Sequence, residues 1–157
     1  MVTKVLFVCL GNICRSPTAH GVMAQKIVER GLIKRIRVDS AGTSDWHLGS
    51  LPDPRTLLAA KTRGYDLSDQ RGRQVTRGDF DEFDFILAMD QQNLANLERI
   101  KPRHFAGHLG LFLDFLPNQP LREVPDPYHG GTQGFEQVLD LVEASCDALL
   151  THILTTA

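Results

Sequence analysis

An apolar run at residues 5–8 ends in Cys9 and leads into a short loop that closes with Arg15, Ser16 and Pro17. A continuous apolar run bounded by a turn is typical of a strand that is buried on both faces, as in a parallel sheet. Pro17 is pre-organised for the first turn of a helix. A strand, a short loop and a helix in this order predict an α/β fold with the loop directly after the first strand.

The loop between Cys9 and Arg15 has the composition of an anion-binding loop. Successive backbone N–H groups of such a loop, together with the positive end of the following helix dipole, point into one concavity that suits a phosphate. Cys9 would lie at its floor, where the positive field favours the thiolate, the form of cysteine that attacks. The planar guanidinium of Arg15 can hold phosphoryl oxygens in a bidentate manner. The pattern therefore predicts a phosphate-handling nucleophile.

Gly11, Asn12 and Ser16 support this interpretation. Gly11 and Asn12 tolerate positive φ, which the loop needs if its amides are to face inward. We expect Ser16 to be the N-cap of the following helix, and its hydroxyl can also donate to a Cys9 thiolate. The alternative is that Cys9 is a buried cysteine at a strand end and Arg15 is a surface charge. The residues between them favour the phosphate loop.

The sequence VCLGNICRSP at residues 8–17 resembles the signature of the low-molecular-weight protein tyrosine phosphatases. Further segments resemble other landmarks of that family, in its order and at similar spacings: DSAGT at 39–43, AMD at 88–90, NL at 93–94 and DPY at 126–128. The resemblance spans nearly the whole chain. It implies a single catalytic domain over residues 1–157, which hydrolyses phosphotyrosine in proteins and small aryl phosphates through a cysteinyl-phosphate intermediate on Cys9.

The resemblance also implies the site residues and the partners. The catalytic residues would be Cys9, Arg15 and Asp126. The residues around the bound substrate would be Leu10, Gly11, Asn12, Ile13, Cys14, Ser16, Trp46 and Tyr128. The partner would be a tyrosine-phosphorylated protein, with a bacterial tyrosine kinase as one candidate, and inorganic phosphate would be the product. No cofactor and no metal are implied.

A thiolate that expels an alkoxide or phenoxide calls for a general acid on the leaving-group side. Asp126 is the candidate, because Pro127 restricts its backbone and because it lies in a long loop, residues 117–134, that can fold over the site. The same carboxylate could then activate the water that hydrolyses the phosphocysteine. Taken alone, Asp-Pro is a common turn, so its occurrence together with the Cys9 loop carries the assignment.

Further residues are expected to support the loop and the substrate ring. Asn12 and Ser16 belong to this supporting set, and the resemblance implies that Ser40 hydrogen-bonds Asn12. Trp46 and Tyr128 would form the aromatic walls of a deep slot, which suits phosphotyrosine better than phosphoserine. The plain alternatives are a strand-end hydroxyl for Ser40 and ordinary packing for Trp46.

Three positions in and near these motifs have consequences of their own. His129 follows Tyr128 where many family members have a second tyrosine, so phosphorylation at that position is not available. Gln70 stands where a histidine is common, which removes a titratable group near the loop. Cys14 shares the short loop with Cys9, and oxidation could lock Cys9 reversibly if the two thiols reach a disulfide-compatible distance. The alternative for Cys14 is a buried cysteine with no redox role.

Composition is that of a small globular enzyme and argues against several other classes. A net charge of −2 over 157 residues gives no basic excess of the kind that nucleic-acid binding requires. Three cysteines, an odd number, without a signal peptide indicate a reducing compartment, so we expect a cytoplasmic protein. No apolar run approaches the roughly 20 residues of a membrane span, so no membrane partner is expected.

Strand-like and helix-like segments alternate along the chain. They predict a single-domain, four-stranded parallel sheet with helices on both faces and the phosphate-binding loop after strand 1. The predicted strands are residues 4–8, 36–40, 85–89 and 109–115. The predicted helices are residues 17–30, 54–64 with Asp53 as N-cap, 91–99 and 134–154. Cys146 lies on the apolar stripe of the last helix and is expected in the core.

Two other patterns are interpreted without a catalytic role. His104 and His108 have the helical spacing of a metal pair, but neighbouring glycines disfavour a helix and no third ligand is evident. The basic stretch at residues 70–77 is predicted to be a solvated face, on which Arg71 or Arg73 could attract acidic phosphopeptides.

Two further functions remain open at this stage. A thiol-dependent arsenate reductase would share the fold, but it relays electrons through further cysteines, and none lies between residues 15 and 145. A phosphate-sensing or phosphopeptide-binding module would use the loop as a receptor. Such a module has no need for a nucleophile and an acid, so the presence of Cys9, Arg15 and Asp126 together favours the enzyme.

Overall fold

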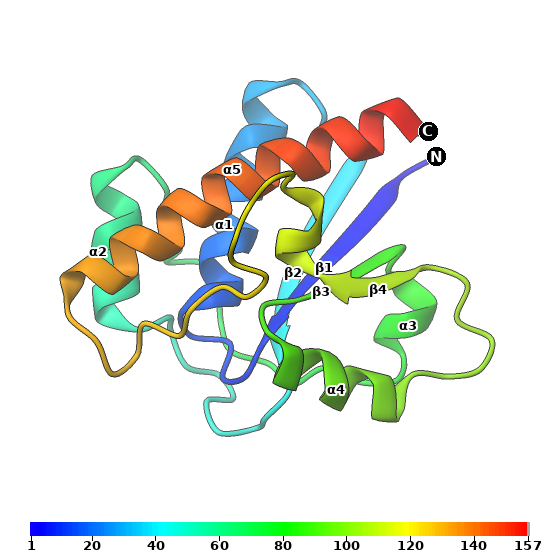
Figure 1. The fold of residues 1–157 in the computed structure, drawn as a ribbon, viewed down its shortest axis with the longest axis horizontal. Coiled ribbons are helices and arrows are strands. Elements are labelled where there is room, and N and C mark those ends of the chain that lie inside the picture. The colour runs from blue at the N-terminus through cyan, green and yellow to red at the C-terminus, as the bar shows by residue number, and fades with distance from the viewer. Residues whose placement is uncertain (157) are drawn as a thin grey trace.

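The sheet of the computed structural model, which describes residues 1–156, consists of four parallel strands in the order β2-β1-β3-β4 (Figure 1). The strands are β1 (Thr3–Cys9), β2 (Ile36–Gly42), β3 (Phe85–Ala88) and β4 (His108–Leu111). β1 pairs with both β2 and β3, and the register places Cys9 beside Gly42. The predicted α/β class and the four-stranded parallel sheet are confirmed.

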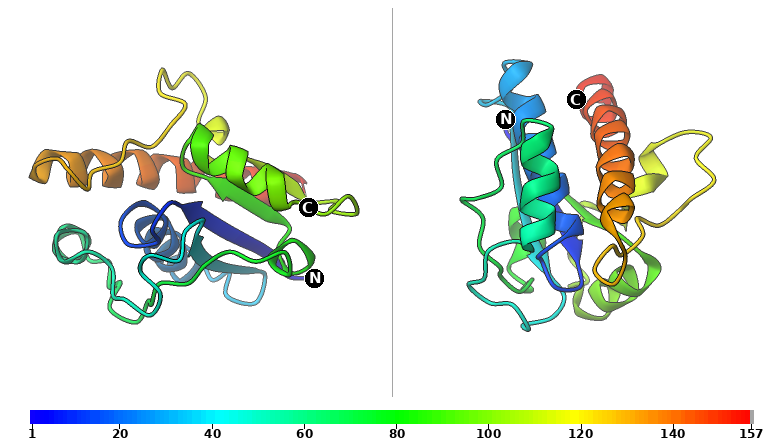
Figure 2. Two further views of the ribbon diagram at one scale, coloured as in Figure 1. Left: turned by 90° about the horizontal axis from the view of Figure 1, so that it is seen from below. Right: turned by 90° about the vertical axis from the view of Figure 1, so that its left-hand side faces the viewer.

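Helices cover both faces of this sheet. They are α1 (Arg15–Glu29), α2 (Pro54–Thr62), α3 (Asp79–Glu82), α4 (Gln91–Ile100), the short 3-10 helix η1 (Phe112–Phe115) and α5 (Thr132–Thr156). Buried side chains of α1 and α5 pack on one face, and those of α3 and α4 pack on the other. α1 and α5 lie side by side, as the right-hand view of Figure 2 shows, and α2 packs against α5. None of the helices within residues 1–156 combines the length and the hydropathy that crossing a bilayer would require.

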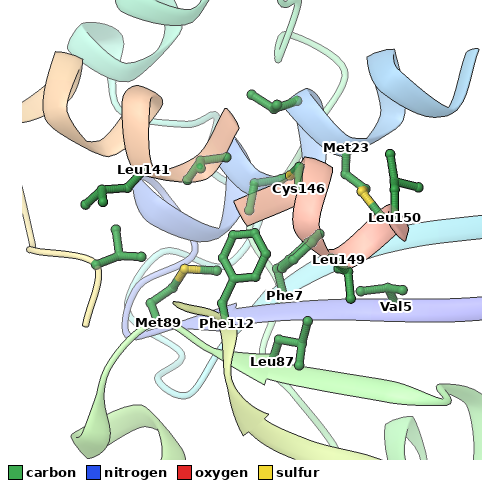
Figure 3. Packing of buried hydrophobic residues seen from close by; sticks show 14 of the residues in the cluster. Val5, Phe7, Met23, Leu87, Met89, Phe112, Leu141, Cys146, Leu149 and Leu150 are labelled. Atoms are coloured by element: carbon green, nitrogen blue, oxygen red, sulfur yellow. The ribbon is translucent and has the colours of Figure 1, made fainter. Parts of the chain in front are cut away.

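The central strand β1 alternates its side chains between two apolar layers. Val5 and Phe7 face the layer that contains α1 and α5, whereas Leu6 and Val8 face the layer that contains α4. Figure 3 shows the first layer, in which the rings of Phe7 and Phe112 meet edge to face with centroids 4.8 Å apart. Burial on both faces makes β1 a rigid support for the residue at its end.

The order of the strands determines where a ligand can bind. The chain passes from β1 to β2 on one side and then returns to β3 on the other side of β1. In open parallel sheets, the crevice outside the carboxyl ends of the strands at such a reversal is the usual binding site. Cys9 is the last residue of β1 and therefore lies at this crevice.

The fourth strand differs from the prediction. Residues 109–115 are not one strand, because β4 ends at Leu111 and Phe112–Phe115 forms η1. The last register pair of β3 and β4 is Ala88 with Leu111, so no partner strand continues beyond that point. Phe112 and Leu113 are both buried, which a strand with one exposed face would not allow. The short helix α3 was not predicted at all.

The ends of the helices were predicted with mixed success. Ser16 is not the N-cap of α1, because the helix begins at Arg15 and Cys14 occupies the N-cap position without a side-chain hydrogen bond. Asp53 is the N-cap of α2, as predicted, and its carboxylate accepts a hydrogen bond from the N–H of Arg55 at 2.8 Å. α5 extends beyond the predicted limits at both ends, and Cys146 is fully buried on its apolar face, as expected.

Candidate active site

A cavity of about 260 Å³ opens at the carboxyl end of β1. Cys9 is only 3% exposed, so it lies at the bottom of the cavity. The residues that line it are Cys9, Leu10, Gly11, Ile13, Cys14, Arg15, Trp46, His47, Asp126, Tyr128 and His129. Of the predicted site residues, Asn12, Ser16 and Ser40 do not line the cavity and lie behind the loop. The lining position of His47 was not predicted.

The backbone between Cys9 and Arg15 forms a cradle for an anion. Asn12 has φ of 57°, a left-handed conformation that asparagine tolerates better than most residues, whereas Gly11, for which positive φ was also expected, does not adopt it. The backbone N–H groups of residues 10–14 donate to no acceptor within residues 1–156. Since α1 begins at Arg15, the positive end of its dipole adds to the field of these N–H groups. The arrangement suits a phosphate, as the sequence predicted.

Ser16 connects the loop to the thiol of Cys9. The hydroxyl oxygen of Ser16 lies 3.0 Å from Cys9 Sγ and accepts a hydrogen bond of 2.9 Å from Nδ2 of Asn12. Because the Asn12 amide occupies the acceptor side of the hydroxyl, the hydroxyl hydrogen has two acceptors within reach, Cys9 Sγ at 3.0 Å and the carbonyl oxygen of Ala41 at 3.4 Å, and a thiolate at the shorter distance is the stronger of the two. Ser16 is fully buried, so this contact is shielded from water.

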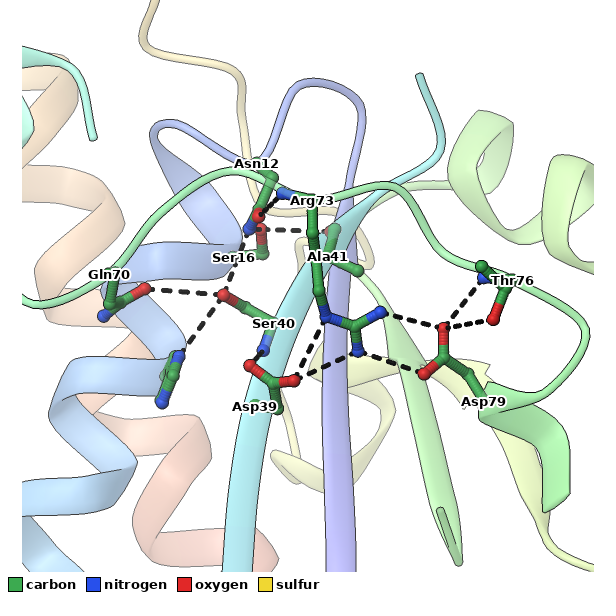
Figure 4. Close-up of polar contacts among 10 residues, drawn as sticks. Asn12, Ser16, Asp39, Ser40, Ala41, Gln70, Arg73, Thr76 and Asp79 are labelled. Carbon is green, nitrogen blue, oxygen red and sulfur yellow. Dashed lines mark hydrogen bonds and ion pairs between the residues drawn. The ribbon is translucent and has the colours of Figure 1, made fainter. Parts of the chain in front are cut away.

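The side chain of Asn12 is held from behind by Ser40, as predicted. Nδ2 of Asn12 donates to Ser40 Oγ at 3.0 Å, and Ser40 Oγ donates to Oε1 of Gln70 at 3.4 Å (Figure 4). Gln70 brings no titratable group to this network, but His20 does, since its Nδ1 lies 3.3 Å from Ser40 Oγ. Burial lowers the pKa of His20, and the negative charge of Asp39 opposes this shift only in part.

Arg15 is held in place by a partner that sequence reasoning did not identify. Its Nη1 donates to Asp90 Oδ2 at 2.7 Å and to the carbonyl oxygen of Val124 at 3.1 Å, while Nη2 lies 3.8 Å from Asp126 Oδ2. Burial alone lowers the pKa of Arg15, but the negative charges of Cys9, Asp90 and Asp126 outweigh burial and raise the pKa above its ordinary value. Asp90 ends the AMD segment, and its place directly after β3 was the signal that could have identified it.

The segment that carries Asp126 is anchored beside the Cys9 loop. The N–H of Val124 donates to the carbonyl oxygen of Met89 at 2.8 Å, just beyond the end of β3. Figure 1 shows the segment between η1 and α5 passing next to the loop that follows β1. Asp126 Oδ1 accepts a hydrogen bond from the N–H of Tyr128 at 3.1 Å, and its side chain is 47% exposed. Asp126 therefore faces both Arg15 and solvent at the mouth of the cavity.

The walls of the cavity are aromatic, as expected. Trp46 is 69% exposed and Tyr128 is 40% exposed, so both rings can contact a ligand at the mouth. The guanidinium of Arg55 lies 5.4 Å from the ring centroid of Tyr128 and 4.8 Å from that of Phe135. Arg55 also donates to both carboxylate oxygens of Asp53. Tyr128 is thus supported from behind by a residue that the sequence analysis did not single out.

The three cysteines are all free thiols. Burial raises the pKa of Cys14 to about 12, with further contributions from the nearby charges of Asp53 and Cys9, whereas the neighbouring hydroxyl of Thr56 acts in the opposite direction. Cys14 is therefore protonated at neutral pH. Burial also raises the pKa of Cys146, which packs in the main core cluster away from the cavity.

The basic stretch at residues 70–77 is only in part the solvated face that was predicted. Arg71 is exposed and donates to the carbonyl oxygens of Ser68 and Gln70, so it matches the prediction. Arg73 does not, because its half-buried guanidinium forms ion pairs with Asp39 and Asp79. It does not line the cavity and is not available to attract a phosphopeptide.

His104 and His108 have separate partners. His104 Nε2 lies 2.7 Å from Asp81 Oδ1, and His108 packs against the rings of Phe85 and Phe115. His108 belongs to β4, so the helical spacing of the pair has no structural meaning. Within residues 1–156, no group of three or more His, Cys, Asp or Glu side chains is arranged to hold a metal ion.

Comparison with known proteins gives consistent matches over nearly the whole chain. The family described as low molecular weight phosphotyrosine protein phosphatase matches residues 4–156. A putative low molecular weight protein-tyrosine-phosphatase from Synechocystis sp. is 48% identical over 151 residues, which cover 96% of this chain and 96% of that protein.

Solved structures agree in fold. A protein tyrosine phosphatase from Entamoeba histolytica, crystallised with Hepes in its active site, is similar with a TM-score of 0.94 at 40% identity, and the match covers 98% of both chains. A Drosophila protein described as an arginine phosphatase is similar with a TM-score of 0.90 at 32% identity, and the match covers 96% of this chain and 98% of that chain.

Proposed function

Because the chain belongs to the low molecular weight phosphotyrosine protein phosphatase family, we propose how its own residues carry out phosphotyrosine hydrolysis. In this proposal Cys9 is the nucleophile, Arg15 binds the phosphoryl group, and Asp126 is the general acid and then the general base. One observation carries the proposal: these side chains come from the end of β1, the start of α1 and the segment before α5, and they line one cavity.

In the first step, the Cys9 thiolate attacks phosphorus from the floor of the cavity. The S–P bond forms as the bond between phosphorus and the phenolic oxygen breaks. Asp126, at the mouth, gives its proton to the departing oxygen. The hydroxyl of Ser16, 3.0 Å from Cys9 Sγ, supports the thiolate before attack. The unpaired N–H groups of residues 10–14 would bind the equatorial phosphoryl oxygens.

In the second step, the Asp126 carboxylate takes a proton from water, and the water oxygen attacks phosphorus. The S–P bond breaks, Cys9 leaves as the thiolate, and inorganic phosphate is released. No metal is required, because the loop and Arg15 supply the positive field that a metal would otherwise provide. The exposed side chain of Asp126 allows a water molecule to reach its carboxylate after the alcohol has left.

The fixation of Arg15 supports its proposed role. Asp90 and Val124 both use Nη1, so Nε and Nη2 form no hydrogen bond within residues 1–156 and are free for a bidentate grip on a phosphate in the cavity that Arg15 lines. Nη2 is also the atom nearest Asp126, so the same guanidinium links the phosphoryl group to the general acid. Negative charge that develops on the phosphoryl oxygens in the transition state would therefore be stabilised by an Arg15 guanidinium that is already in position.

The walls support phosphotyrosine over phosphoserine. Because Cys9 is 3% exposed, a phosphoserine side chain would have to bring its backbone down into the cavity, whereas a phosphotyrosine reaches the floor with its ring between Trp46 and Tyr128. Ile13 adds an apolar surface on the loop side. Stacking on such walls contributes binding energy that a short aliphatic side chain cannot gain.

Phosphoarginine is the second candidate substrate, raised by the similarity to the Drosophila protein described as an arginine phosphatase. Aromatic rings such as those of Trp46 and Tyr128 stack on a guanidinium as well as on a phenyl ring, so the peptide comparison below decides between the two substrates. An arsenate reductase relay through Cys146 is disfavoured, because this thiol is fully buried in the core. The phosphopeptide receptor remains an outcome of the test below.

The physiological partner is proposed to be a tyrosine-phosphorylated protein, with an autophosphorylated tyrosine kinase as a candidate. The proposed compartment is the cytoplasm, because a free thiol nucleophile beside a second free thiol requires reducing conditions. A Cys9→Ser variant, which should bind phosphoprotein without turning it over, would recover the partner from a lysate of the source cells.

We also propose that oxidation of Cys9 is reversible through Cys14. Peroxide would convert the Cys9 thiolate to a sulfenic acid with release of hydroxide. The Cys14 thiol would then attack that sulfur, so that an S–S bond forms and water leaves. The pKa of about 12 for Cys14 supports this order, because a protonated Cys14 thiol is not the sulfur that peroxide oxidises first.

The test of the proposed function is phosphate release from matched peptides that carry phosphotyrosine, phosphoserine or phosphoarginine, with EDTA present. Wild type and Cys9→Ser are compared. We expect release from phosphotyrosine alone, lost in Cys9→Ser. Faster release of phosphate from the phosphoarginine peptide would identify phosphoarginine as the substrate in place of phosphotyrosine. Tight binding of a peptide by wild type without phosphate release would favour a phosphopeptide-binding module.

A further inference from the structure

The segment that contains Arg73 lies directly behind the Cys9 loop, although Arg73 does not reach the cavity. The N–H of Gly42, at the end of β2, donates to the carbonyl oxygen of Arg73 at 2.8 Å, and the N–H of Val75 donates to the carbonyl oxygen of Gly42 at 2.8 Å. These two bonds form a short parallel extension of the sheet beside β2. The backbone of Arg73 is thereby held at the level of the loop.

The Arg73 side chain fixes this backbone further by bridging two carboxylates. Nη1 and Nη2 donate to the two oxygens of Asp79 at 3.1 and 3.0 Å, and Nε donates to Asp39 Oδ2 at 3.1 Å. Figure 4 shows the guanidinium between Asp39 and Asp79, directed away from the loop that carries Asn12. The Asp79 side chain is only 9% exposed, so the pair is shielded from solvent.

The N–H of Arg73 makes the contact that matters for the loop. It donates to Oδ1 of Asn12 at 3.0 Å, and no other donor within residues 1–156 reaches that oxygen. With Oδ1 satisfied, the amide nitrogen of Asn12 must face the hydroxyls of Ser16 and Ser40. Arg73 therefore decides which way the buried amide points, and it supports a residue whose backbone is in the left-handed region.

A directed chain of hydrogen bonds follows from this orientation. It runs from the Arg73 N–H to the Asn12 amide and from the amide to the Ser16 hydroxyl. When Cys9 is a thiolate, which can only accept, the hydroxyl completes the chain by donating to Sγ at 3.0 Å in preference to the Ala41 carbonyl oxygen at 3.4 Å. Each donor polarises the next, so the chain favours negative charge on sulfur. Reversal of the Asn12 amide would present its carbonyl oxygen to Ser16, and the Ser16 hydrogen would then turn away from Cys9.

We propose that Arg73 is a positioning residue for phosphotyrosine hydrolysis. The Asp39–Arg73–Asp79 bridge holds the Arg73 N–H against Asn12, and Asn12 in turn holds the phosphate loop and directs the Ser16 hydroxyl at the nucleophile. This role rests on the proposed function of Cys9, because it acts only through that residue and its loop.

The test compares Arg73→Gln with a matched control. Arg63, like Arg73, pairs with more than one carboxylate, in its case those of Glu136, Asp140 and Glu143, but it joins α2 to α5 and does not line the cavity. For each variant we would measure Tm, kcat and KM on the phosphotyrosine peptide, inhibition by inorganic phosphate, and the rate at which iodoacetate alkylates Cys9. Arg73→Lys tests whether a point charge can replace the bidentate fork.

We expect Arg73→Gln to lower kcat on the order of 10- to 100-fold, the cost of a small misplacement of reacting groups. It should also weaken phosphate inhibition and slow alkylation of Cys9. Arg63→Gln should lower Tm without changing kcat or alkylation. Arg73→Lys should recover only part of the loss. If Arg73→Gln does not fold, Asp39→Asn, which leaves the bidentate pair with Asp79 intact, should show the same losses in milder form.

The proposal is overturned if Arg73→Gln, or Asp39→Asn in its place, loses Tm as Arg63→Gln does while kcat, phosphate inhibition and the alkylation rate stay at wild-type values. Failure of the proposed function would give a different result, because Cys9→Ser would then keep its turnover whatever residue stood at position 73.

Discussion

The Asp90 carboxylate accepts a hydrogen bond of 2.7 Å from Nη1 of Arg15, whose side chain is only 4% exposed. Asp90 also caps α4 by accepting from the N–H of Asn93 at 2.7 Å. One carboxylate therefore joins the N-cap of α4 to the first residue of α1. This contact occupies Nη1, so Nε and Nη2 form no hydrogen bond within residues 1–156.

Asp90→Asn should impair catalysis more than binding. The neutral amide removes the charge that holds Arg15, so kcat on a phosphotyrosine peptide should fall on the order of 10- to 100-fold as the guanidinium loses its alignment. Steady-state kinetics and phosphate inhibition would measure the effect, with Glu123→Gln, a change at an exposed residue near α4, as the control. Wild-type kcat in Asp90→Asn would show that Val124 alone orients Arg15.

Asp126→Asn should separate substrates by leaving group. With a phenyl phosphate, whose leaving group needs a proton, kcat should fall by on the order of 10² to 10⁴. With a nitrophenyl phosphate, whose leaving group departs without one, the fall in the first step should be much smaller. Equal losses on both substrates in single-turnover measurements would assign Asp126 a structural role.

The class of fold and the position of the Cys9 loop could be predicted because both depend on patterns among residues that are close together in the sequence. The apolar run before Cys9, the Gly11 and Asn12 pair and the alternation of segments each depend on neighbouring residues only. The buried stripe of the last helix, including Cys146, follows from helical periodicity for the same reason.

The residues that sequence reasoning overlooked act across long distances in the chain. Asp90 meets Arg15 across 75 positions, and Arg73 meets Asn12 across 61. A charged residue in a polar stretch resembles a solvated one until its partner is placed by the fold, which is why Arg73 was taken for part of a solvated face. The end of β4 was also predicted wrongly for a long-range reason. β4 stops at Leu111 because its partner strand β3 ends at Ala88, which the residues of β4 themselves do not indicate.

His20 should make stability fall in mildly acidic solution. Burial lowers the pKa of His20 in the folded protein below the ordinary value of 6.5. Between the folded and the ordinary pKa, the unfolded chain binds a proton that the folded protein does not, so the free energy of unfolding declines as pH falls through this window and is restored above it. Urea unfolding of wild type and His20→Gln at several pH values would measure the slope.

The His20→Gln curve should be flatter than the wild-type curve below about pH 6.5. His108, whose pKa burial also lowers, is present in both proteins and cancels in the comparison. Parallel curves would mean that the hydrogen bond to Ser40 keeps His20 equally able to bind a proton in both states.

Cys14→Ser should make peroxide inactivation irreversible. In wild type, the proposed disulfide protects Cys9 from further oxidation, and a thiol reductant should restore activity. Without the Cys14 thiol, Cys9 should progress to the sulfinic acid, and only a small part of the activity should return. Cys146→Ser, which removes a thiol from the core, is the control. Full recovery of Cys14→Ser after peroxide and reductant would exclude the protective role.

The central claim is that Cys9 carries the phosphoryl group during turnover. The Asp126→Asn variant should accumulate this intermediate with a nitrophenyl phosphate, because the second step loses its base. Acid quenching followed by mass spectrometry of the loop peptide would locate the added phosphoryl group. We expect phosphocysteine at Cys9 in Asp126→Asn, and none in the double variant that also carries Cys9→Ser. Turnover with no phosphorylated peptide, or with the group on Cys14, would contradict it.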